Sequence, residues 1–189
     1  ESRKPPAGWK RKAGLALATG AGIIFSFLIE ASGRERLGHA IRFVVSGTYL
    51  LSQVPIYRSA IHKNTIRACL TLAIGLMLLG FLVVTLYPVN RVAVLHLTLV
   101  GGFAVLTFGV ATRVVFGHSG NHPLLARPNR WLWVAVGLMV LGMATRISGD
   151  FFPQERVSHY NYGAGVWIIG TIVWAIYVLP KVLLSDPDP

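Results

Sequence analysis

The sequence predicts an all-α fold, a polytopic membrane helix bundle of about six transmembrane helices. The first observation is composition: 53% of the 189 residues are hydrophobic and only 13% are charged, whereas soluble domains carry about a quarter charged residues. The second is the mean hydropathy of +0.58. The third is a series of apolar runs near the roughly 20 residues that one span requires.

The predicted domain organisation is simple. Residues 1–12 form a basic cytoplasmic tail ending in Trp9 and three cationic residues, which are typical of an interfacial anchor. Residues 13–184 form one transmembrane domain, and 185–189 form a second tail. The sequence does not begin with methionine, which we interpret as a trimmed chain. The predicted spans are 13–29, 40–57, 66–87, 92–116, 131–147 and 160–184.

The charge distribution predicts the orientation. Six spans place both termini on one side, and that side carries most of the 18 lysines and arginines. We therefore expect both termini in the cytoplasm. The net charge of +11 fits basic loops beside a lipid bilayer, so we expect no nucleic acid partner. The single cysteine, Cys69, excludes an intrachain disulfide. No phosphate-binding loop and no catalytic triad pattern is present, so the sequence specifies no reaction.

Histidine is the commonest metal ligand, and the predicted topology sorts the six histidines by side. Those close to the span ends also have a simpler interpretation, as interfacial residues without a ligand. The non-cytoplasmic side receives His39, His96 and His159, and the cytoplasmic side receives His62, His118 and His122.

His96 differs because it lies four or five residues inside its span, about 6–8 Å below the helix start. Polar residues at such depth usually face the bundle interior. Gly101 and Gly102 follow, and small residues allow a neighbouring helix or a flat cofactor to approach. Two interpretations stay open: an axial ligand of a haem, or a histidine hydrogen-bonded across helices.

His118 lies 22 residues after His96, which is roughly 33 Å along a continuous helix. One metal cannot use both, so if both histidines are ligands there are two sites, one near each face. Arg113 either snorkels to lipid phosphate or pairs with a carboxylate such as a haem propionate. The segment "FGVATRVV" (108–115) is echoed by "LGMATRIS" (141–148), which indicates either a weak internal repeat or chance similarity.

The stretch "LHLTLVGGFAVLTFGVATRVVFGHSG" (95–120) resembles the signature of NnrS-type proteins, and "GVWIIGTIVWAIYVLPKVLL" (165–184) resembles their last helix. The matching residues are His96, the glycine pair 101–102, Thr112–Arg113 and Gly117–Gly120. The resemblance is to the C-terminal half of that family, clear over 91–184 and limited to span order before it.

The resemblance implies a bacterial inner-membrane protein that binds haem b, possibly with copper, and acts in the nitric oxide response or in respiratory electron transfer. It implies cofactor-binding roles for His96, His118, Arg113, His39 and His159, and metal binding for His96, His118 and His122. This chain matches only half the length of the family, and its third predicted span contains no histidine. Both features favour an alternative, in which the protein is a cofactor-free accessory subunit of a larger complex or a homodimer. A small-anion transporter using Arg113 is a third hypothesis.

Overall fold

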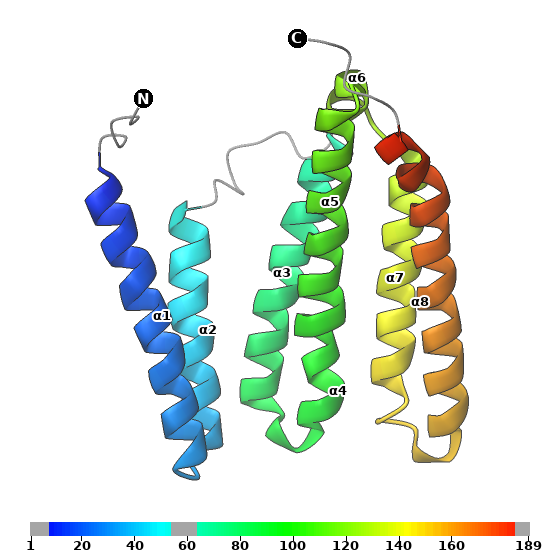
Figure 1. The fold of residues 1–189 in the computed structure, drawn as a ribbon. Coiled ribbons are helices and arrows are strands. Elements are labelled where there is room, and N and C mark those ends of the chain that lie inside the picture. Colours follow the sequence, from blue (N-terminus) through cyan, green and yellow to red (C-terminus); the bar gives the residue numbers. More distant parts are fainter. Residues whose placement is uncertain (1–7, 54–63, 184–189) are drawn as a thin grey trace.

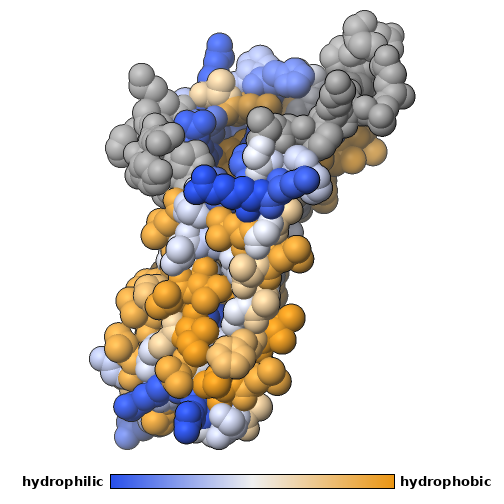
Figure 2. All heavy atoms as spheres, turned by 90° about the vertical axis from the view of Figure 1, so that its left-hand side faces the viewer, coloured by the Kyte–Doolittle hydropathy of each residue, from blue (hydrophilic) through white to orange (hydrophobic). Residues whose placement is uncertain are grey.

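The computed structural model describes residues 8–53 and 64–183, and within these ranges it contains helices and turns but no strand. The predicted all-α membrane fold is confirmed. Five helical segments are long and apolar enough to cross a membrane: Trp9–Ala31, Thr65–Leu86, Pro88–His118, Arg130–Ser148 and Pro153–Leu183. Figure 2 shows the matching surface, apolar over the middle of the molecule and hydrophilic at both ends.

Three antiparallel helical hairpins stand side by side (Figure 1). The first pairs α1 (Trp9–Ala31) with α2 (Glu35–Gln53), and Gly33 turns between them at φ +86°. The third pairs α7 (Arg130–Ser148) with α8 (Arg156–Val178), which continues as η6 (Leu179–Leu183). The predicted second span, 40–57, begins within α2, and its last four residues lie outside the described residues.

The second hairpin pairs α3 (Thr65–Leu86) with a long, irregular helix. After the short turn η3 (Pro88–Asn90), this helix runs through α4 (Arg91–His96), the π-helical segment η4 (Leu97–Ala104) and α5 (Val105–His118). Sequence reasoning predicted one regular span and did not anticipate the π-helical segment. Such segments are rare and occur frequently at functional sites.

We name the two ends of the bundle by their connections. The hairpin end holds the turns 32–34, 87–90 and 149–155, and the tail end holds the start of α1, α6 (His122–Ala126) and η6. At the tail end, Gly117 and Gly120 were expected to stop the fourth span, but α5 continues through Gly117 to His118. The chain turns instead at Gly120, whose φ of +67° favours glycine.

Glycines bring the central helices into close contact. A Cβ on Gly102 would lie 2.7 Å from the Cβ of Met77 on α3, and a Cβ on Gly142 would lie 2.6 Å from the carbonyl oxygen of Gly163 on α8. Small residues at helix interfaces are the usual means of association within a bilayer. The buried core lies mainly among α3, α5, α7 and α8, around Phe116, Val105 and Leu132.

Candidate functional site: two cavities at the hairpin end

A cluster of charged side chains lies inside the bundle near the hairpin end. Glu30 at the end of α1 accepts a hydrogen bond from Arg42 of α2 at 2.7 Å and forms an ion pair with Arg91 of α4 at 2.9 Å. Arg42 also donates to Ser26 Oγ at 3.2 Å and to His39 Nδ1 at 3.2 Å. The Glu30 side chain is only 11% exposed. This network, which we call the Glu30 cluster, joins the first hairpin to the second.

The Glu30 cluster fixes the hydrogen-bonding state of His39. An arginine can only donate, so Nδ1 of His39 must be the acceptor of the Arg42 bond, and the Nε2 of the neutral ring carries the hydrogen. His39 is 1% exposed, and its Nε2 has no hydrogen-bond partner. The nearest carboxylate oxygen, Glu30 Oε1, is 3.9 Å away. His39 therefore presents a buried, unused N–H donor.

A cavity of about 730 Å³, the cluster cavity, opens beside the Glu30 cluster. Residues of α1, α2, α3 and the α4–η4–α5 helix line it, and most of its wall is apolar. Thr98 of η4 reaches this cavity, is 3% exposed, and its hydroxyl also has no partner. The polar wall is formed by Glu30, His39, Arg42, Ser46, Tyr49, Arg91 and Thr98.

A second cavity of about 450 Å³, the His96 cavity, lies between α4–η4 and the third hairpin. The Nδ1 of His96 is 2.8 Å from the carbonyl oxygen of Val92, so Nδ1 is the donor and Nε2 keeps a free lone pair. Metal-bound histidines are commonly oriented in this way, through a carbonyl on the other ring nitrogen. The cavity is lined by His96, Val100, Gly142, Met143, Arg146, Tyr160, Gly163, Ala164, Trp167 and Ile168.

Two further donors at the His96 cavity lack an acceptor. Nη1 of Arg146 and Nε1 of Trp167 are buried without a hydrogen-bond partner. The guanidinium of Arg146 lies 3.3 Å from the ring centre of Tyr160, and its nearest carboxylate oxygen, on Asp150, is 4.0 Å away. A buried donor without a partner is costly. His96, Arg146 and Trp167 therefore line one cavity, and the latter two each contain a donor that the protein leaves without an acceptor.

The structure separates the other candidate residues. His39 and His96 line different cavities, and His159 lines neither: its Nδ1 is 3.0 Å from the Ser148 hydroxyl, and its ring packs edge-on against Phe152. Arg113, His118 and His122 are exposed at the tail end, whereas His62 lies outside the described residues. Within residues 8–53 and 64–183, no three histidine, cysteine or acidic side chains converge to hold a metal.

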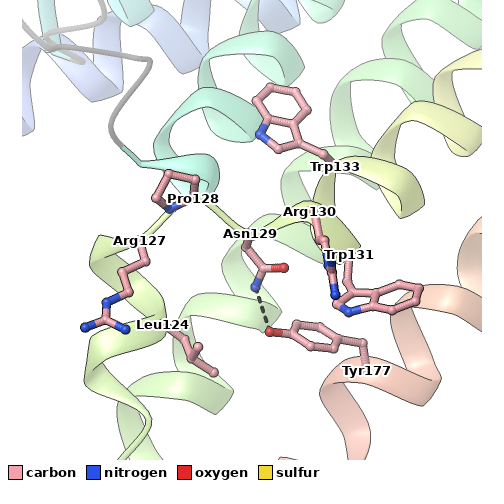
Figure 3. A pocket seen from close by; sticks show the side chains of 8 residues that line it. All are labelled: Leu124, Arg127, Pro128, Asn129, Arg130, Trp131, Trp133 and Tyr177. Atoms are coloured by element: carbon pink, nitrogen blue, oxygen red, sulfur yellow. Dashed lines mark hydrogen bonds between the residues drawn. The ribbon is translucent and has the colours of Figure 1, made fainter.

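The tail end instead contains a structural junction around Asn129. Its side chain accepts from the Leu132 amide and donates to the Tyr177 hydroxyl at 2.9 Å, and its own amide donates to Thr65. Figure 3 shows Asn129 facing Tyr177, with Arg127 and Trp131 nearby at a cavity of about 400 Å³. Asn129 therefore ties α7 to α8 and to α3 beside residues typical of a membrane interface.

Sequence reasoning missed the partners of the histidines. The Glu30 cluster could have been suspected from the sequence, because Glu30 and Arg42 are charged residues at the edges of apolar runs on the same predicted side. Arg146 could have been suspected from its place in the repeated Ala-Thr-Arg segment. Nothing in the sequence marked Trp167 and Tyr160, since aromatic residues near span ends are expected in any membrane protein.

Comparison with known proteins gives one match. The family model described as "NnrS protein" matches residues 1–185, nearly the whole chain. The match therefore extends the sequence resemblance from the region 91–184 to the first residue. No curated protein and no solved structure matches the chain.

Proposed function

The chain belongs to the NnrS family, and from this premise we propose that it is a bacterial inner-membrane protein that binds haem b at the His96 cavity. We propose further that it acts in the nitric oxide response or in respiratory electron transfer. The observation that carries the proposal is the grouping of a free imidazole Nε2 with the two unused donors of Arg146 and Trp167.

The residues present fit the chemistry of haem. When bound, haem would supply an iron that can take an imidazole nitrogen as a ligand and bind small diatomic molecules. The Val92 carbonyl holds His96 in the tautomer whose Nε2 can coordinate. Arg146 and Trp167 can donate to a propionate carboxylate. Gly142 and Gly163 also line the cavity, where they let α7 and α8 approach each other closely.

The proposal also includes a copper site on the cytoplasmic side. Copper binding by His118 and His122, with Arg113 nearby, rests on the family resemblance, and the three side chains are exposed. The proposed orientation, with both termini in the cytoplasm and the two cavities towards the opposite side, rests on the excess of basic residues at the tail end.

The test is the absorption spectrum of the purified full chain, with haem quantified by the pyridine haemochrome assay. We expect a Soret band that is lost in His96→Ala. His122→Ala, which removes an exposed histidine, is the matched control and should keep the band. A colourless protein without bound iron would overturn the haem proposal.

A second candidate function is a cofactor-free accessory subunit or a homodimer. The observation that favours it is the large uncovered apolar surface of the outer helices: only 6% of the most apolar stretch of α1 is buried, and 11% of that of α8. Lipid or a partner subunit can cover such surfaces. Measuring the native mass of the purified protein in mild detergent distinguishes this function from the haem proposal. A monomer without further chains would contradict the accessory role.

A further inference from the structure

The cluster cavity plays no part in the haem proposal, because it shares no lining residue with the His96 cavity. It is a groove between α1 and the α4–η4–α5 helix, with α2 and α3 packed between these two walls. We infer that the groove binds one anionic phospholipid, with an acyl chain along its apolar walls and the phosphate beside Arg91.

Each wall of the groove is the apolar face of one helix. On α1 the lining residues recur every three or four positions and therefore share a face: Ala16, Gly20, Ile23 and Phe27. The opposite wall consists of Leu95, Leu99, Phe103 and Leu106. Phe27, Leu99 and Phe103 are each about half exposed, so the protein itself leaves the walls partly uncovered. Exposed apolar surface of this kind is typical of a ligand-binding groove.

The dimensions of the groove fit an acyl chain better than another helix. On α1 the lining runs from Ala16 to Glu30, about 21 Å along the helix axis. This length accommodates a chain that crosses one leaflet of the hydrocarbon core, which is roughly 15 Å thick. A helix of the same length with its side chains occupies on the order of 1,600 Å³, more than twice the cavity volume of about 730 Å³.

Arg91 provides a contact for the head group at the hairpin end of the groove. Its side chain lines the cavity, is 47% exposed, and reaches Glu30 through Nη1 at 2.9 Å. Arg42 pairs with the same carboxylate, and among the described residues no other carboxylate pairs with either arginine. Two guanidinium groups therefore share one negative charge. A phosphate beside the exposed arginine would balance the remaining positive charge, which is favourable in surroundings of low polarity.

The charges near the mouth of the groove also favour an anion. At the hairpin end, the first two hairpins carry more arginines than acids: Arg34, Arg36, Arg42 and Arg91 against Glu30 and Glu35. Glu35 is exposed and does not line the cavity. Basic residues beside a bilayer attract anionic lipid head groups. The occupant that matches both the apolar walls and this charge is an anionic phospholipid.

The experiment measures lipid binding to the purified full chain by native mass spectrometry in a delipidating detergent. Phosphatidylglycerol and phosphatidylcholine with identical acyl chains are added in equal amounts, and their masses distinguish the adducts. We expect the first bound lipid to be phosphatidylglycerol in preference. Arg91→Gln, which removes one positive charge, should lower this preference about fivefold. Arg36→Gln, at an exposed arginine outside the cavity, should leave the preference unchanged.

A second pair of variants tests the position of the acyl chain. Gly20→Leu fills the groove without a clash, since a Cβ at Gly20 meets nothing within 4 Å, and should abolish binding of the first lipid. Gly14→Leu, at an equally open position of α1 outside the groove, should retain it. Ala16→Leu, on the same wall, repeats the test if Gly20→Leu fails to fold.

Three outcomes would overturn the inference. Equal lipid binding in Gly20→Leu and Gly14→Leu would place the lipid elsewhere, and equal effects of Arg91→Gln and Arg36→Gln would indicate attraction to the whole basic surface. Dissociation of a dimer by Gly20→Leu would assign the groove to a helix of a second copy. His96→Ala should lose haem yet keep the lipid, so failure of either proposal is distinguishable from failure of the other.

Discussion

The tripeptide Ala-Thr-Arg occurs twice in this protein, and the two copies have opposite roles. At the end of α5, Thr112 is fully buried and accepts a hydrogen bond from the indole of Trp174 at 2.8 Å, while Arg113 is exposed. At the end of α7, Thr145 is half-buried and bonds only within its own helix, while the Arg146 side chain is 24% exposed and lines the His96 cavity.

The two copies represent a wider contrast between the ends of the bundle. At the hairpin end, three charged residues, Glu30, Arg42 and Arg146, line cavities. At the tail end, Arg113, Arg127 and Arg130 are exposed. The contrast teaches that the face a helix buries, and not the local motif, decides which residue of a repeated tripeptide can take part in binding.

The largest effect should come from removing Glu30, the carboxylate that pairs with both Arg42 and Arg91. Glu30→Ala leaves the buried charge of Arg42 without compensation, so we expect the free energy of unfolding to fall by about 3–5 kcal/mol. Titration with a denaturing detergent measures the change. Glu35→Ala, at an exposed position in the first turn of α2, is the control. An equal loss in both variants would remove the contrast.

The second prediction compares the two arginines of the repeated tripeptide. Arg146→Ala removes a donor that we assign to a haem carboxylate, so haem retained after gel filtration should fall about tenfold at limiting haem, since hydrogen bonds to charged groups are the stronger ones. Arg113→Ala should retain the wild-type amount. Equal retention in the two variants would show that Arg146 does not contact the cofactor.

The smallest effect concerns the two threonines. Thr112→Val deprives the Trp174 indole of its acceptor, and we expect a loss of about 1 kcal/mol in stability. Thr145→Val, whose hydroxyl bonds only to the Leu141 carbonyl of its own helix, should change stability by less than this. Thermal melting of both variants in the same detergent compares them, and a larger shift for Thr145→Val would reverse the assignment.

The sequence predicted the fold class well because apolar runs of membrane length are separated by short polar or glycine-containing turns, a pattern visible without tertiary contacts. It also singled out His96, since a histidine several residues inside an apolar run is unusual. The π-helical segment was missed because its apolar sequence resembles that of a regular span. It contains Gly101 and Gly102, where a Cβ would meet Met143 of α7 and Met77 of α3.

The grouping of residues was harder to predict than their identity. The predicted topology placed His39, His96 and His159 on one side of the membrane, and His39 or His159 was predicted to bind one haem together with His96. The structure distributes them over different surroundings because each side chain follows the rotation of its own helix. A π-helical turn changes that rotation. The direction in which side chains after Leu97 face could therefore not be predicted from a regular helical period.

The heptapeptide from His96 to Gly102 forms a partition one helix thick. His96 and Val100 face one cavity, while Thr98 and Leu99 face the other. Gly101 and Gly102 leave no room for a larger side chain, since a Cβ at either position would collide with a neighbouring helix. Protein engineers who redesign either cavity must therefore treat these seven residues as one inseparable unit, and score each substitution on both of its faces.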